Sequence, residues 1–389
     1  MRSRVSRRRF LATSAALSLA GGSFLRAAAA PGSSRIFIGT GNRGPGSGIL
    51  SASWNAKTGE IGETALAAEV DSPTFLATFR RPNGETLLYS ISEASGAGAR
   101  VSAFRVVPGT GRLLLLNQVP SGGDGPAHVS VSPDGRSVFA ANYGGGSVSS
   151  FHIQADGSLS PAVSNIQFTG SGPYKGRQDK PHTHSAVCSP DGRYLFVNEL
   201  GLDRIFLFHR DPATSKVTPN DPPFWSSRPG AGPRHIAWNR DGRFVYGSNE
   251  LDSTVDTLQW EEGAGSASLR TLQTRSSLPE GFAPNTAFVG EILTSADGRN
   301  VYAGNRVADD TVAIFDIDRS TGLLSAPRFA PSGGKNSRHV ALDPTDRWMV
   351  ISHQTSSDLT VLERDPRTGA LSAPRRSYPV NKPMCVVFV

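Results

Sequence analysis

Short runs of alternating apolar and polar residues, separated by tight-turn signals, recur from about residue 72 to the C-terminus. Each unit contains a β-run, an Asp-Gly-Arg or related turn, and a second β-run with an apolar residue at every other position. Asp-Gly and Asn-Gly close hairpins between strands because they tolerate a positive φ. A weaker copy with Asn83-Gly84 at its turn covers Phe75–Ser92, and the clearer turns, 57, 50, 56 and 49 residues apart, lie at Asp134, Asp191, Asp241, Asp297 and Asp346. The pattern predicts a β-hairpin repeat of about 50 residues.

A third β-run follows each hairpin, and a fourth, outer one follows another turn. The predicted third strands are Ser147–Ile153, Ile205–Arg210, Thr254–Trp260, Thr311–Ile317 and Leu359–Glu363. Four antiparallel strands in roughly 50 residues describe one blade of a β-propeller. A tandem array of β-sandwiches is the alternative, but it would need linkers, and the sequence contains no segment typical of one.

The blade count depends on the two ends of the repeat region. Residues 35–70 supply only three strands, and Pro383–Val389 supplies a single strand of the inner type. Joined, these segments would form one further blade. We therefore predict an all-β fold, a seven-bladed β-propeller over residues 31–389, closed by a C-terminal inner strand that joins three N-terminal strands. The three strands are Arg35–Thr40, Ile49–Asn55 and Ala65–Val70, and the other six blades begin near Ser72, Pro126, His182, Pro233, Ala287 and Ser337.

Residues 1–30 have the layout of an export signal. A basic segment is followed by a mildly apolar stretch over Leu11–Leu25 and by the small residues Ala27–Ala30. The run Ser6-Arg7-Arg8-Arg9-Phe10-Leu11 resembles a twin-arginine signal. An ordinary arginine-rich secretory signal is the alternative. We expect a periplasmic or extracellular protein, exported by the twin-arginine route and free of the membrane after cleavage.

The overall charge of +7 overstates how basic the folded part is. Six arginines and no other charged residue lie in residues 1–30, which leaves +1 from Pro31 onward. A nucleic-acid-binding protein needs a clustered basic footprint, so we expect no nucleic-acid partner. A closed single-chain propeller also leaves no sheet edge that needs a partner, so we expect a monomer.

Two cysteines, Cys188 and Cys385, are too few for a disulfide framework. The repeat places them on inner strands of different blades. One bridge between them is conceivable, but we predict two buried free thiols.

Candidate functional residues appear where the repeat varies. One position near the start of the inner strands holds His128, His235, Glu291 and His339, and we place His184 in the same position with one extra residue in its strand. These side chains would lie at one mouth of the central channel. For His128 and His339 the alternative is a structural role, in which the ring bridges neighbouring blades by hydrogen bonds.

A second variable position follows the asparagine that ends the second strand. It holds Tyr143, Glu250 and Arg306, while Glu199 replaces the asparagine itself. A lone Glu or Arg at the end of an inner strand is costly unless it is paired or engaged with a ligand.

More cations come from other segments of the same mouth. Arg234 and Arg338 each precede a channel histidine, and residues 173–184 add Arg177 and His182. Together these groups predict an anion-binding site with an acid/base pair. The alternative is a ring of mutually satisfied ion pairs that stiffens the channel.

Several motifs spread over residues 35–389 carry a family resemblance: Arg177-Gln178, Pro181-His182-Thr-His184-Ser185, Gly232-Pro-Arg234-His235, Asn249-Glu250-Leu251, Glu291-Ile292, Asn305-Arg306 and Thr368-Gly-Ala-Leu371. The chain resembles the lactonase family of seven-bladed propellers, which groups 6-phosphogluconolactonase-like proteins with fungal 3-carboxy-cis,cis-muconate cyclases. The resemblance implies a catalytic set of His184, Arg234, Glu250 and Arg306. For substrate binding we assign Arg177, Gln178, His182, His235 and Glu291. Asn198-Glu199-Leu-Gly and Ser337-Arg338-His339 depart from the family pattern without touching the catalytic set.

Lactone opening needs a base to activate water and donors for the developing oxyanion. Glu250 or His184 would be the base, and Arg234 and Arg306 would hold the oxyanion or an anionic group. We expect no cofactor, and no metal either, because no two-histidine-carboxylate cluster occurs at local ligand spacing. Metal ligation by residues from different blades is the alternative. The substrate would be a small lactone or carboxylate, and export favours an unphosphorylated aldonolactone. A lactonising cyclase and a non-catalytic scaffold are the alternatives.

Overall fold

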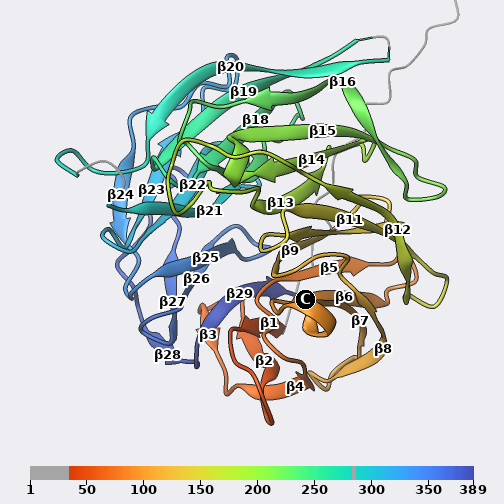
Figure 1. The fold of residues 1–389 in the computed structure, drawn as a ribbon. Helices are drawn as coiled ribbons and strands as arrows, with labels where there is room; N and C mark the ends of the chain where they lie inside the picture. Colours follow the sequence, from red (N-terminus) through yellow and green to blue (C-terminus); the bar gives the residue numbers. More distant parts are fainter. Residues whose placement is uncertain (1–34, 264, 283–285) are drawn as a thin grey trace, which may run out of the picture.

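The computed structural model describes residues 35–263, 265–282 and 286–389, so the predicted export signal over residues 1–30 lies outside the described residues. Figure 1 shows β-sheets that follow one another in chain order around a ring. Within the described part of the chain there are seven sheets. Their inner strands touch in the cyclic order β5, β9, β13, β17, β21, β25, β29 and again β5. The prediction of an all-β, seven-bladed propeller is confirmed.

Six blades are four-stranded antiparallel sheets, each built from consecutive strands that run from the channel outward. Their bounds are β5 (Leu76–Arg80), β6 (Thr86–Ser92), β7 (Arg100–Val106) and β8 (Leu113–Pro120); β9 (Pro126–Val131), β10 (Ser137–Asn142), β11 (Ser147–Ile153) and β12 (Leu159–Gln167); β13 (Thr183–Cys188), β14 (Tyr194–Glu199), β15 (Arg204–Arg210) and β16 (Val217–Ser226); β17 (Pro233–Trp238), β18 (Phe244–Asn249), β19 (Thr254–Glu262) and β20 (Ala267–Ser276); β21 (Phe288–Thr294), β22 (Asn300–Arg306), β23 (Thr311–Asp316) and β24 (Arg328–Pro331); β25 (Ser337–Leu342), β26 (Trp348–His353), β27 (Asp358–Glu363) and β28 (Ser377–Pro379).

The remaining blade joins the two ends of the described chain. β29 (Pro383–Phe388) pairs antiparallel with β1 (Arg35–Thr40), which pairs with β2 (Gly48–Asn55), and β2 pairs with β4 (Ala65–Glu69). In Figure 1 the blue β29 lies beside the red β1. The predicted closure is therefore confirmed, with one addition, the two-residue β3 (Glu60–Ile61) beside the end of β2.

The described residues contain just two helical segments, the 3-10 turns η1 (Gly96–Gly98) and η2 (Leu200–Leu202). Neither is long and apolar enough to span a bilayer.

The hairpin turns adopt the backbone that their sequence predicts. Gly135, Gly192, Gly242 and Gly298 have φ between 67° and 74°. In the blade of β25, Asp346 occupies the place of this glycine, with φ at 61°. The alignment of the repeat units in the sequence analysis paired Asp346 with the turn aspartates, which is wrong by one residue. Aspartate is among the few residues that tolerate this conformation.

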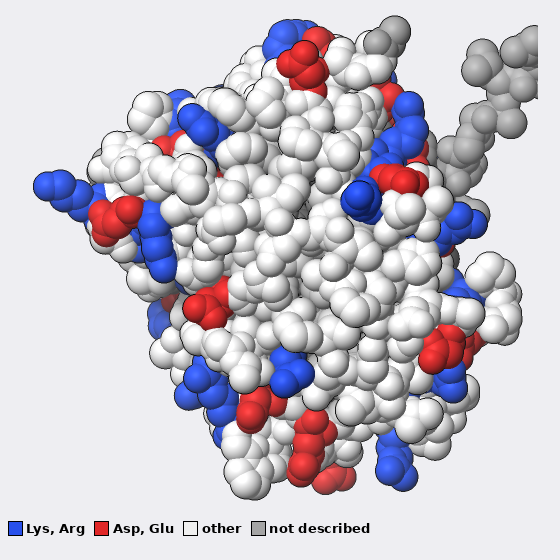
Figure 2. All heavy atoms as spheres, turned by 45° about the vertical axis from the view of Figure 1, so that its right-hand side comes forward, with Lys and Arg blue, Asp and Glu red and all other residues white. Residues whose placement is uncertain are grey.

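Apolar cores fill the spaces between neighbouring blades. One core combines Leu87 and Tyr89 of β6 with Val138 and Ala140 of β10, and comparable clusters join other adjacent blades. Both cysteines are buried free thiols, as predicted. On the face shown in Figure 2, basic and acidic side chains lie close to one another near the rim, and no broad patch of one sign covers it.

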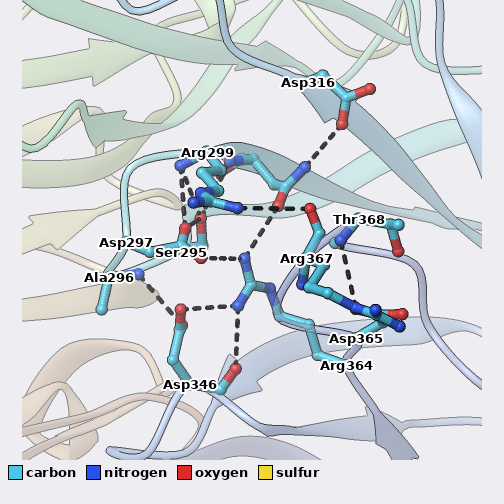
Figure 3. A network of polar contacts seen from close by, with 12 residues as sticks. Ser295, Ala296, Asp297, Arg299, Asp316, Asp346, Arg364, Asp365, Arg367 and Thr368 are labelled. Atoms are coloured by element: carbon cyan, nitrogen blue, oxygen red, sulfur yellow. Dashed lines mark hydrogen bonds and ion pairs between the residues drawn. The ribbon is translucent and has the colours of Figure 1, made fainter.

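Buried ion pairs also join blades at the turn side of the ring. Figure 3 shows Arg364, at the end of β27, reaching Asp297 in the turn before β22 and Asp346 in the turn before β26. The Arg364 nitrogens lie 2.8 Å from Asp297 Oδ2 and 3.0 Å from Asp346 Oδ2. Arg210 makes the equivalent contact with Asp134, at 2.6 Å, between the blades of β13 and β9. Asp134 and Asp297 thus lie in the turn of their own hairpin and also bind an arginine of the next blade, whereas Asp346 binds Arg364 within its own blade.

Candidate active site

A β-bulge near the start of several inner strands sets the positions of the channel side chains. The pairing of β13 with β14 passes from Thr183 to Ser185, so that His184 is the extra residue. Arg234 is the extra residue in β17, and Arg338 is the extra residue in β25. A bulge bends the strand and redirects side chains. As a result, the adjacent residues Arg234 and His235 both contact groups in the channel, Glu250 and Glu291 respectively.

This register corrects the alignment of His184 with the other channel histidines. His184 shares its position with Arg234 and Arg338, one residue before the position of His235 and His339. Ser185 takes the histidine position in its blade, and its hydroxyl donates to the Arg234 carbonyl at 2.7 Å. The spacing to the turn glycine carried a signal of this difference, since His184 lies eight residues before Gly192, whereas His235 lies seven before Gly242.

Glu250 lies at the centre of the candidate site. It follows β18, is buried, and its Oε2 is 2.9 Å from Arg234 Nε and 3.0 Å from Arg306 Nη2. Arg177 pairs with Oε1. Burial alone would raise the pKa of the Glu250 carboxyl, but Arg306, Arg234 and Arg177 outweigh burial and hold this pKa well below its usual range. Glu250 is therefore a permanent carboxylate.

His184 lies beside this carboxylate, with Nε2 at 3.8 Å from Glu250 Oε2. Burial, and after it the charge of Arg234, lowers the pKa of His184 well below its usual range. The imidazole is therefore neutral at pH 7. The structure brings together all four residues of the predicted catalytic set.

A cavity of about 300 Å³ opens in front of Glu250 and His184. Its walls are Glu93, Ala127, Tyr143, Arg177, His184, Glu250, Phe288, Arg306, Val307 and Arg338. The side chain of Arg338 has no hydrogen bond or ion pair with another described residue. Arg234 Nη1 and Arg306 Nε are buried without a hydrogen-bond partner among the described residues.

The charges around the cavity do not balance. Four arginines, including Arg234 behind the wall, face the carboxylates of Glu250 and Glu93. Burial and the charge of Arg338 lower the pKa of Arg234 to about 9, which reflects the crowding of cations. A pre-formed cavity with surplus guanidinium donors suits an anionic ligand or an oxygen that becomes anionic during a reaction.

Two of the predicted substrate-binding residues support the cavity from outside. Gln178 is fully buried, and its amide donates to Leu200 O and to Asp203 Oδ1, each at 2.7 Å. These bonds fix the segment that carries Arg177. His182 stacks on Tyr143, with ring centroids 4.4 Å apart. Neither side chain is among the cavity walls, so a direct contact with substrate stays a prediction.

His235 and Glu291 lie deeper in the channel. His235 Nε2 is 3.2 Å from His184 Nδ1, and His235 Nδ1 is 2.9 Å from Glu291 Oε1. Glu291 and His339 line a second cavity, of about 470 Å³. The structure therefore places Glu291 away from the cavity of Glu250, although both were predicted for one site.

His128 makes the kind of contact expected if its role is structural, a hydrogen bond to a neighbouring blade. Its Nδ1 is 3.5 Å from the backbone N–H of Ala186 in the next blade.

The sequence analysis gave no catalytic or substrate-binding role to six of the ten cavity walls, among them Arg338, Tyr143 and Phe288. Arg338 had a usable signal, because it precedes His339 as Arg234 precedes His235. Tyr143 had one as well, since it shares the position of Glu250 and Arg306. Phe288 had none; the guanidinium carbons of Arg177 and Arg306 lie 5.3 Å and 5.9 Å from its ring centroid.

Comparison with known proteins adds to this geometry. A family model described as lactonase, 7-bladed beta-propeller, matches residues 35–388. A 6-phosphogluconolactonase of Bacillus subtilis is 34% identical over 353 residues, which cover 91% of this chain and 97% of that protein. One of Formosa agariphila is 31% identical over 352 residues, covering 89% of this chain and 97% of that protein. The solved structure of a periplasmic gluconolactonase of Pseudomonas aeruginosa superposes with a TM-score of 0.84 at 33% identity, covering 92% of this chain and 99% of that one.

Proposed function

We propose, from the premise that this chain belongs to the lactonase family of seven-bladed β-propellers, that it hydrolyses a sugar lactone in the arginine-lined cavity. The observation that carries the proposal is the combination of a neutral histidine, a fixed carboxylate and unpaired guanidinium N–H groups around one cavity. These are the parts that ester hydrolysis by activated water requires.

His184 is the base in this proposal. The electron pairs of Glu250 are already shared among three guanidinium groups, and the low pKa of its carboxyl makes it a poor proton acceptor. His184 is neutral and presents Nε2 toward the same space. Glu250 therefore orients the arginines and the attacking water, and His184 accepts the proton.

The arginines stabilise charge. As water adds to the lactone carbonyl, the carbonyl oxygen becomes an oxyanion, which the guanidinium group of Arg306 in the cavity wall would stabilise, with the charge of Arg234 behind it. The ring C–O bond then breaks, and the proton held by His184 passes to the departing ring oxygen. Arg338, which has no partner among the described residues, would bind an anionic substituent of the substrate.

The test is a rate comparison with background hydrolysis subtracted, because these lactones also open spontaneously. We expect Arg306→Ala to lower kcat/KM at least about a hundredfold, as for loss of an oxyanion donor. Arg240→Ala is the matched control, since Arg240 is exposed in the turn between β17 and β18. An unchanged rate for Arg306→Ala, or a wild type no faster than buffer, would overturn the proposal.

The same assay addresses the substrate class. The surplus of cations favours a lactone with an acidic substituent, whereas export favours one without phosphate. A sugar lactone carrying a carboxylate meets both conditions. We therefore expect glucarolactone to be opened faster than glucono-1,5-lactone, with 6-phosphoglucono-1,5-lactone as the phosphorylated comparison. Arg338→Ala should slow the acidic substrates at least about tenfold and leave the uncharged one nearly unchanged.

We also propose that residues 1–30 form an export signal, that residues 31–389 form the propeller domain and that the protein is a monomer. The resemblance to a periplasmic enzyme from Pseudomonas aeruginosa supports a periplasmic location.

A further inference from the structure

A line of hydrogen-bonding side chains leads from the candidate base through the channel to the second cavity. His184 Nδ1 is 3.2 Å from His235 Nε2, and His235 Nδ1 is 2.9 Å from Glu291 Oε1. His184 and His235 are each 3% exposed, and the Glu291 side chain is 12% exposed. The three residues come from neighbouring blades, on β13, β17 and β21.

The order of these contacts fixes where the protons reside. A carboxylate only accepts hydrogen bonds, so Glu291 requires a hydrogen on His235 Nδ1. The neutral His235 ring then has an electron pair on Nε2, which accepts from a hydrogen on His184 Nδ1. His184 is left with its electron pair on Nε2, the nitrogen that lies 3.8 Å from Glu250 Oε2 at the first cavity. This is the tautomer that a base at that cavity needs.

The second cavity opens at the other end of the channel. The first cavity is lined by Phe288 and Arg338, at the beginnings of β21 and β25, whereas the second is lined by Leu342 and Pro344, at and beyond the end of β25. Glu291 is a wall of the second cavity. Its Oε2 has no hydrogen-bond partner among the described residues, and His339 Nε2 is 3.6 Å away.

We propose that Glu291 and His235 are positioning residues, which hold His184 in the tautomer and orientation of a base from the opposite end of the channel. The inference rests on the proposed function. When water attacks, its O–H bond breaks and the proton binds His184 Nε2, while Nδ1–H stays bonded to His235. The resulting imidazolium then gives the proton to the ring oxygen as the C–O bond breaks. No proton passes to Glu291 in these steps.

The surroundings of His184 explain why such support is needed. The groups that face it are Glu250, Arg234, Arg306, Arg338, His235 and the ring of Tyr143. The three arginines disfavour a positive imidazole, and the charge of Glu250 is already shared with Arg177, Arg234 and Arg306. Glu291 is the carboxylate on the side of His184 that faces away from Glu250. It stabilises a positive charge on His184 by polarising the ring of His235 that lies between them.

The kinetic test replaces the carboxylate by its isosteric amide. An amide can donate to His235 Nδ1 and reverse both tautomers, so Glu291→Gln should lower kcat between about tenfold and 10⁴-fold, the upper value being that of the analogous change in a serine protease triad. KM should stay within about threefold, because Glu291 does not line the substrate cavity. His128→Asn is the matched control, since His128 is a buried channel histidine outside the line, and its kcat should change less than about threefold.

A second measurement does not depend on turnover. The chain has eight histidines, so ¹⁵N-histidine NMR can assign tautomers residue by residue. We expect Nδ1–H for both His184 and His235 in the wild type and in His128→Asn, and Nε2–H for both in Glu291→Gln.

The outcomes separate the two proposals. Nε2–H on His184 in the wild type, or an unchanged kcat in Glu291→Gln while Arg306→Ala is impaired, would overturn the positioning role alone. A wild type without lactonase activity would overturn the proposed function, and the NMR result would still decide the tautomers.

Discussion

Two buried glutamates near equivalent strand ends show how neighbours decide the chemistry of a residue. Glu250 follows β18 and is surrounded by arginines, which hold its pKa low. Glu199 ends β14 and has only neutral donors, namely Thr183 Oγ1 and the backbone N–H groups of His182 and Gly201. Burial raises the pKa of Glu199 to about 7, against which these hydrogen bonds act only in part. Of the two, Glu250 lines the cavity, whereas Glu199 holds the backbone N–H groups of His182 and Gly201.

The raised pKa of Glu199 predicts a pH-dependent stability. Between about pH 4.5 and pH 7 the folded state binds more protons at this group than the unfolded state. Its contribution is thus complete below pH 4.5 and is lost as the pH rises through 7. Glu199→Gln should remove this loss. Between pH 4.5 and pH 8 the free energy of unfolding of the variant should therefore rise, relative to that of the wild type, by up to about 3 kcal/mol.

Urea unfolding at several pH values measures the gain. The exposed Glu261→Gln serves as the control and should run parallel to the wild type. A difference between Glu199→Gln and wild type that does not vary with pH would contradict the assignment.

At the scale of the element, the hairpins of β13, β17 and β25 each have a bulged end and a turn end with different roles. The bulges carry His184, Arg234 and Arg338 to the channel mouth. In two of the turns, Asp134 and Asp297 bind an arginine of the following blade, as Figure 3 shows for Asp297 and Arg364. Function and inter-blade cohesion are therefore placed at opposite ends of the same strands.

This separation predicts stability loss without a direct effect on the active site. Arg364 is buried and also donates to Tyr302 Oη at 2.7 Å and Asn300 Oδ1 at 3.0 Å. Arg364→Ala leaves buried acceptors unpaired, so it should lower the free energy of unfolding by about 3–5 kcal/mol. The folded fraction should keep the kcat/KM of the wild type.

The control lies three residues away. The Arg367 side chain is 88% exposed, and Arg367→Ala should cost less than about 0.5 kcal/mol. Chemical denaturation of both variants measures the difference, and equal losses would argue against a role of Arg364 in joining blades.

At the scale of the whole molecule, the ring is closed by one strand from the far end of the chain. β29 contributes Cys385 and Val386 to two of the cores between blades. It also places the backbone N–H of Val389 3.0 Å from the carbonyl of Arg35. The ends of the folded region are therefore neighbours, although they are far apart in sequence.

This closure makes two opposite predictions. A chain that ends at Lys382 lacks β29, exposes the edge of β1, and should give aggregated or non-cooperatively unfolding protein. A circular permutant, with residues 389 and 35 joined by a short linker and new ends at the exposed turn between Ala213 and Thr214, keeps every strand and should stay soluble and cooperative. Size-exclusion chromatography and thermal unfolding test both, and a cooperative truncated chain would refute the closure argument.

The sequence by itself determined the fold nearly strand by strand. The alternation of apolar residues and the Asp-Gly turns are local signals, and all five predicted third strands begin or end at an observed strand bound, with Ser147–Ile153 identical to β11. The break in the repeat at Glu250 and Arg306 also pointed to the cavity, because an unpaired charge at a buried strand end needs a reason.

Tertiary structure alone decided how the channel residues divide. The spacing to the turn already aligns His184 with Arg234 and Arg338, but the strand pairing alone shows that each is the extra residue of a β-bulge. Glu291 and Glu250 were predicted for one site at the channel mouth, yet they line different cavities, and His235 lies between His184 and Glu291. Repeats specify each blade through local contacts, whereas the chemistry of the channel comes from side chains of different blades that meet only when the ring closes.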